Sequence, residues 1–128
     1  MEQAGGPPPI ILLVEARAAL RSAEAEVLRR AGYEVCEAPD AGTAAEVLSR
    51  AAVNLVILDA CRDPAEVERF LELVRGVRPG APCILTGLNP RGGSLVRKPC
   101  GATVTCLEKP LSRELLLRTV DAALGRCA

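Results

Sequence analysis

Short apolar runs alternate along the chain with longer segments whose apolar residues recur every three or four positions. Runs of Leu, Val and Ile without polar alternation are typical of strands buried on both faces of a sheet. The pattern predicts five strands, at Ile10–Val14, Tyr33–Ala38, Leu55–Asp59, Cys83–Thr86 and Val104–Leu107.

The segments between the strands have the apolar spacing of helices. They are Ala18–Arg30, about Thr43–Arg50, a segment that begins at Asp63 and Pro64, and Ser112–Leu124. In the first helix, Glu24 is expected to lie away from the apolar face, which consists of Leu20, Ala23, Val27 and Leu28. Proline and glycine residues between positions 87 and 101 leave room for only one or two helical turns. The helix between the fourth and fifth strands is therefore expected to be short or irregular.

Strands and helices in regular alternation predict an α/β fold. Short connections with helical crossovers imply a parallel sheet that is covered on both faces. We expect a three-layer, doubly wound, five-stranded sheet with strand order 2-1-3-4-5. Residues 10–126 are expected to form this one domain, and residues 1–9, with two glycines and three prolines, to be a flexible leader.

The composition of the chain restricts the classes of function that are possible. The chain has 128 residues, is 49% hydrophobic, and carries 16 basic and 16 acidic residues, so nothing favours a nucleic-acid or membrane surface. Because the chain has no histidine, a Ser/His/Asp triad and histidine-ligated metals are excluded. The six cysteines include no C-x-x-C pair, and we expect those inside strands to act as small apolar residues. No signal peptide or membrane-length apolar run is present, so a reduced, cytoplasmic protein is expected.

Polar residues end several of the predicted strands. Asp59 closes the third strand, Thr86 closes the fourth, and Glu15 and Lys109 follow the first and fifth. In open parallel sheets, sites are built at the carboxyl ends of the strands. With strand order 2-1-3-4-5 the first and third strands are neighbours, so Glu15 and Asp59 are expected to be adjacent.

Five short motifs, in this order and spacing, resemble the receiver domain of bacterial response regulators, which has a flavodoxin-like fold. The similarity covers about Ile10 to Leu124. The motifs are Ile10-Ile11-Leu12-Leu13-Val14-Glu15, Ala31-Gly32-Tyr33-Glu34-Val35, Leu55-Val56-Ile57-Leu58-Asp59, Ile84-Leu85-Thr86-Gly87 and Glu108-Lys109-Pro110.

The resemblance implies a signalling protein and not an enzyme. Asp59 would accept a phosphoryl group from a histidine kinase or a phosphotransfer protein. Lys109 would pair with the phosphoryl oxygens, and Thr86 would donate a hydrogen bond to them. Glu15, Asp59 and the backbone carbonyl of Cys61 would hold Mg²⁺. The signal would pass to an unknown downstream protein or output domain, and the chain would be a stand-alone regulator or part of a longer protein.

Ala16 departs from the family, which usually has a second acid at this position. The missing carboxylate implies that Mg²⁺ binds weakly or not at all. Two interpretations therefore stay open: a phosphoacceptor receiver, and a pseudo-receiver that acts as a phosphorylation-independent interaction module. Without metal, an ion pair between Lys109 and Asp59 is expected to neutralise the pocket. A small nucleotide-binding enzyme is a third possibility, but the chain has neither a G-x-G-x-x-G motif nor a P-loop.

Overall fold

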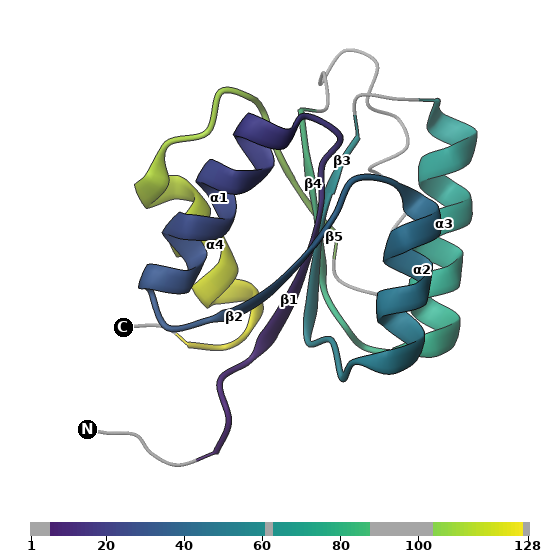
Figure 1. Cartoon of the computed structure of the whole chain (residues 1–128), viewed down its shortest axis with the longest axis horizontal. Coiled ribbons are helices and arrows are strands. Elements are labelled where there is room, and N and C mark those ends of the chain that lie inside the picture. Colours follow the sequence, from purple (N-terminus) through teal and green to yellow (C-terminus); the bar gives the residue numbers. More distant parts are fainter. Residues whose placement is uncertain (1–5, 61–62, 88–103, 127–128) are drawn as a thin grey trace.

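A parallel sheet forms the middle layer of the protein (Figure 1). The structure is a computed structural model, which describes residues 6–60, 63–87 and 104–126. The five strands lie in the order β2-β1-β3-β4-β5, which confirms the predicted topology. Their bounds are β1 Ile10–Val14, β2 Glu34–Ala38, β3 Leu55–Asp59, β4 Cys83–Thr86 and β5 Val104–Leu107.

Helices cover both faces of the sheet, as Figure 1 shows. Helices α1 (Ala18–Arg30) and α4 (Arg113–Ala123) lie on one face, and α2 (Ala41–Arg50) and α3 (Pro64–Val77) lie on the other. The predicted short helix between β4 and β5 falls on residues 88–103, which lie outside the described residues.

Side-chain caps set the starts of three helices. The Asp40 carboxylate accepts a hydrogen bond from the Thr43 backbone N–H at 2.8 Å, so α2 begins two residues earlier than predicted. Asp63 accepts one from Ala65 at 3.2 Å, as expected for the start of α3, and Ser112 caps α4. Caps of this kind satisfy amide groups that have no partner inside the helix.

Alternation along the strands divides the apolar core into two layers. On β3, Val56 and Leu58 pack toward α2 and α3, while Leu55 and Ile57 pack toward α1 and α4. Successive side chains of a strand point to opposite faces, and all five residues of β3 are buried. This strand therefore contributes buried side chains to both layers of the core.

Helix α1 buries only part of its predicted apolar face. Ala25 and Leu28 are fully buried, whereas Leu20 is half-buried and Ala23 is exposed. Glu24 precedes Ala25 and is carried inward with it to 7% exposure. The expectation that Glu24 lies away from the buried face is therefore wrong.

The described cysteines are free thiols, and one is fully inside the core. Cys83 is 3% exposed, and burial raises its pKa to about 11, so the thiol stays protonated and packs as an apolar group. Within the described residues, no helix is long and apolar enough to cross a membrane.

The core of β4 can be tested with two truncations of the same side chain. Leu85 is 0% exposed, so Leu85→Ala is expected to lower the free energy of unfolding by about 3 kcal/mol through lost burial and a residual cavity. Leu73 on α3 is 38% exposed, and Leu73→Ala is expected to cost less than about 1 kcal/mol. Urea denaturation of both variants measures the difference, and equal losses would contradict the placement of these residues.

Candidate functional site

The alternation of side chains also assembles the polar cluster. Two positions beyond Leu13, Glu15 points to the face that carries α1 and α4, and Asp59 does so two positions beyond Ile57. Thr86 shares this face for the same reason. The sheet register places Asp59 directly beside Thr86. All three polar side chains are buried, with exposures of 1% for Glu15, 6% for Asp59 and 2% for Thr86.

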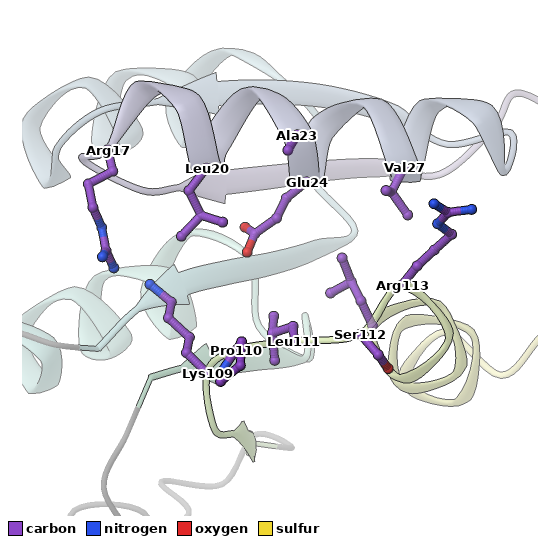
Figure 2. A pocket seen from close by; sticks show the side chains of 11 residues that line it. Arg17, Leu20, Ala23, Glu24, Val27, Lys109, Pro110, Leu111, Ser112 and Arg113 are labelled. Carbon is purple, nitrogen blue, oxygen red and sulfur yellow. The ribbon is translucent and has the colours of Figure 1, made fainter.

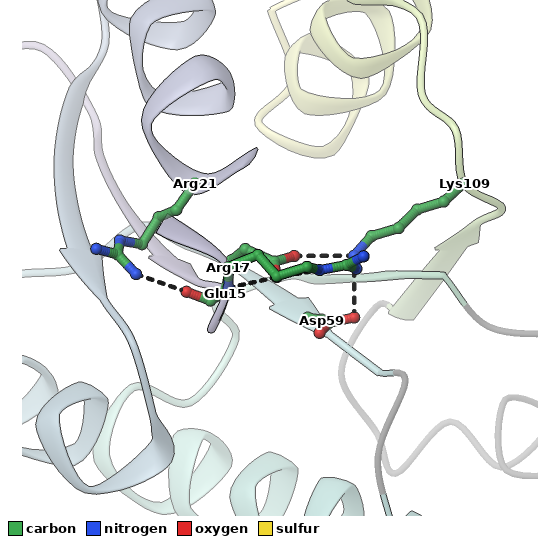
Figure 3. Close-up of polar contacts among 5 residues, drawn as sticks. All are labelled: Glu15, Arg17, Arg21, Asp59 and Lys109. Carbon is green, nitrogen blue, oxygen red and sulfur yellow. Dashed lines mark hydrogen bonds and ion pairs between the residues drawn. The ribbon is translucent and has the colours of Figure 1, made fainter. Parts of the chain in front are cut away.

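Lys109 joins the two carboxylates. Its Nζ lies 2.8 Å from Oε1 of Glu15 and 3.1 Å from Oδ1 of Asp59 (Figure 3). The predicted ion pair between Lys109 and Asp59 is thus confirmed. The lysine comes from the connection between β5 and α4, and its bond to Pro110 is cis.

Mutual pairing decides the charge states in this cluster. Burial alone would raise the pKa of Glu15, but hydrogen bonds from Lys109 and from the Arg17 backbone outweigh it, and the pKa is lowered. Burial would likewise lower the pKa of Lys109, but its hydrogen bonds to Glu15 and Asp59 raise it. The lysine is therefore a cation and Glu15 is an anion at neutral pH.

Arg17 is a site residue that sequence reasoning missed. Its backbone N–H donates to Oε2 of Glu15 at 3.0 Å, and its Nε donates to the same oxygen at 3.3 Å. In Figures 2 and 3 the ends of the Arg17 and Lys109 side chains lie side by side. The available signal was a cation placed next to Ala16, where the second acid of the family is missing.

Arg21 fixes the backbone at Glu15. Its Nη1 donates to the carbonyl oxygen of Glu15 at 2.9 Å, and its Nε contacts Glu37 of β2 at 3.2 Å. Arg29 contacts the other oxygen of Glu37 at 3.1 Å. Arg21 thus connects the end of β1, through a hydrogen bond to its backbone, with the edge strand β2, through an ion pair with Glu37.

Glu24 lies at a groove between α1 and the segment that leads from Lys109 into the first turn of α4 (Figure 2). Burial raises its pKa to about 6, and the negative charge of Glu15 adds to the effect. The groove is otherwise largely apolar, with Leu20, Val27, Leu111 and Leu116 in its lining.

Four of the residues predicted for the site therefore meet at one place: Glu15, Asp59, Thr86 and Lys109. The fifth, Cys61, lies outside the described residues. Their roles in phosphorylation and metal binding stay predictions.

The arrangement does not fit a Mg²⁺ ion. Mg²⁺ needs oxygen ligands in near-octahedral geometry, usually one or two carboxylates with water. Each oxygen of Glu15 already accepts a hydrogen bond, one from Lys109 and the other from Arg17. Ala16 supplies no ligand. Among the described residues, no group of three or more Asp, Glu or Cys side chains could hold a metal ion.

Solved structures place this architecture among known proteins. A response regulator receiver domain protein (CheY-like) from Methanospirillum hungatei JF-1 is 26% identical, with a TM-score of 0.80 over 92% of this chain and 94% of its own. The chemotaxis response regulator CheY4 of Vibrio cholerae is 27% identical, with a TM-score of 0.79 over 91% and 99% of the two chains. The receiver domain from the hybrid histidine kinase CckA is 29% identical, with a TM-score of 0.72 over 90% and 98%. No protein-family model and no curated protein matches the sequence.

The fold and the polar cluster at its carboxyl edge define a doubly wound, flavodoxin-like α/β domain. Within that class, the three structural neighbours named above are response regulator receiver domains, which confirms the resemblance predicted from the five motifs. This fold supports a response regulator role in two-component signalling, and receiver domains are generally signalling modules and not enzymes.

Removal of the bridging cation should destabilise the domain. Lys109→Met leaves the buried carboxylates of Glu15 and Asp59 facing one another without the cation between them, and we expect a loss of about 3 kcal/mol. The double variant Lys109→Met/Asp59→Asn removes one of the opposed charges and should recover part of that loss. Urea denaturation near neutral pH measures both, and a double variant less stable than Lys109→Met would contradict the bridge.

Glu24 should make stability depend on pH. A carboxyl group that titrates at about 6 in the folded protein and near 4.5 when unfolded favours unfolding as the pH rises between these values. Glu24→Gln removes this effect, so above pH 6 it should raise the free energy of unfolding by up to about 2 kcal/mol. Below the ordinary pKa the two proteins should be nearly equal. Glu68→Gln, at an exposed position of α3, is the control variant for urea denaturation across this range.

Proposed function

We propose that this domain is the phosphoacceptor of a two-component phosphorelay, with Asp59 as the nucleophile. One observation carries the proposal: Asp59, Thr86 and Lys109 converge at the carboxyl edge of a receiver-type sheet. A carboxylate at this place can attack a phosphoryl group, and a lysine beside it can pair with the phosphoryl oxygens.

The proposed donor is a histidine kinase or a phosphotransfer protein, and the receiver of the signal is a downstream protein or output domain. One structural neighbour is the receiver domain from a hybrid histidine kinase, which supports this kind of partner. In the proposed reaction an oxygen of Asp59 bonds to phosphorus while the bond between phosphorus and the donor nitrogen breaks. The donor imidazole leaves with the electron pair. Thr86 donates to a phosphoryl oxygen of the product.

A second candidate is a pseudo-receiver, which keeps the fold as an interaction module without phosphorylation. It is favoured by Ala16 together with the engaged oxygens of Glu15, because the metal that assists the family reaction finds no ready site. In this case the Lys109 bridge is a permanent structural contact.

Intact mass spectrometry separates the two candidates. The protein is incubated with the small phosphodonor phosphoramidate and Mg²⁺, and we expect one phosphoryl adduct that is absent in Asp59→Asn. Asp40→Asn is the matched control, because asparagine caps a helix as well as aspartate does and Asp40 lies outside the cluster. If the wild type forms no adduct while a conventional receiver does so under the same conditions, the pseudo-receiver is the correct assignment.

A further inference from the structure

We propose that Arg17 is the second cation of the phosphoacceptor pocket, and that it takes the place of the divalent metal. The inference rests on the proposed function and adds to it: phosphorylation of Asp59 is independent of Mg²⁺. The starting observation is the mismatch between the pocket and a metal ion, since Glu15 is already held by a lysine and an arginine.

Charge supports this assignment. Glu15 and Asp59 are opposed by Lys109 and Arg17, so the four formal charges cancel without an added ion. In a conventional site a divalent cation offsets the charge of the incoming phosphoryl group. Here the same task falls to two side chains whose ends lie side by side in both close-up views (Figures 2 and 3).

Geometry and exposure suit Arg17 to this task. A guanidinium has five N–H donors in one plane and matches phosphate oxygens in a bidentate manner. The contact with Glu15 uses Nε, and the side chain is 62% exposed, so a phosphodonor can reach it from solution. Lys109 is the more enclosed of the two cations, at 16% exposure.

The local structure of α1 offers independent support. Arg17 occupies the N-cap position, where its side chain makes no capping hydrogen bond. Serine, threonine and aspartate stabilise this position, and a positive charge at a helix N-terminus opposes the helix dipole. A residue that breaks both local preferences at the edge of the pocket points to a role other than holding the helix.

Phosphoramidate supplies both the phosphoryl group and the leaving nitrogen of the proposed step. An oxygen of Asp59 forms a bond to phosphorus, and the bond from phosphorus to the protonated nitrogen breaks with its electron pair going to nitrogen, which leaves as ammonia. Arg17 and Lys109 hold the phosphoryl oxygens during the transfer. Arg17 would then move from Glu15 toward the new aspartyl phosphate.

The experiment compares rates of adduct formation with excess Mg²⁺ and with EDTA, using phosphoramidate and intact mass. For the wild type we expect equal rates in both conditions. Arg17→Ser should slow the reaction about tenfold or more, because one stabilising donor pair is lost. The same variant should keep a urea midpoint close to that of the wild type, because the serine N-cap offsets the lost ion pair between Arg17 and Glu15, and an unchanged midpoint excludes misfolding as the cause. Arg30→Ala, at the other end of α1, should change neither the rate nor its dependence on Mg²⁺.

A binding measurement gives a second readout. Mn²⁺ added alone should show no site in the wild type by electron paramagnetic resonance, whereas Ala16→Asp/Arg17→Ser should bind Mn²⁺ and become faster with Mg²⁺. A wild-type reaction that requires Mg²⁺, an Arg17→Ser rate equal to wild type, or an Mn²⁺ site in the wild type would overturn the role of Arg17 alone. Absence of any adduct in both conditions would overturn the proposed function and this inference together.

Discussion

Two carboxylates that are buried at the ends of adjacent strands repel one another unless a cation lies between them. In this domain Glu15 follows β1, Asp59 ends the adjacent strand β3, and Lys109 reaches both carboxylates. The lysine arrives from the far end of the chain, so β1, β3 and the connection after β5 meet at a single ammonium group. The strand order brings the two carboxylates together, and the lysine offsets the repulsion between them.

Much of this could be predicted from the sequence, because apolar runs and strand ends follow simple rules. The polar residues after Val14, Leu58 and Leu85 have positions in the sheet that follow from strand order and from side-chain alternation. Two features could not be predicted. The apolar residues of α1 are compatible with more than one buried face, and in the folded domain Glu24 is buried beside a groove that residues of α4 also line. Arg17 lies in a connection, where no periodicity tells which way a side chain points.

A cation that belongs to the chain differs physically from one that is taken from solution. A bound metal is present only in proportion to its concentration and affinity, and its binding depends on the protonation of its ligands. A guanidinium is always charged and is always present at the same local concentration. The arginine side chain is also long and flexible. It must be ordered whenever it binds an anion, and this ordering costs conformational entropy that a fixed metal site does not. A pocket that uses arginine therefore always contains its cation, but the position of that cation is less fixed than the position of a bound metal.

Ala16 and Arg17 lie between the last residue of β1 and the first residue of α1, and both side chains are exposed. Neither belongs to one of the two apolar layers. The residues that determine which cation the pocket contains are thus separate from the residues that form the apolar core. Substitution at these two positions can therefore replace an arginine by a metal ion, or the reverse, with little change in folding stability. The pocket can change over evolutionary time while the fold is preserved.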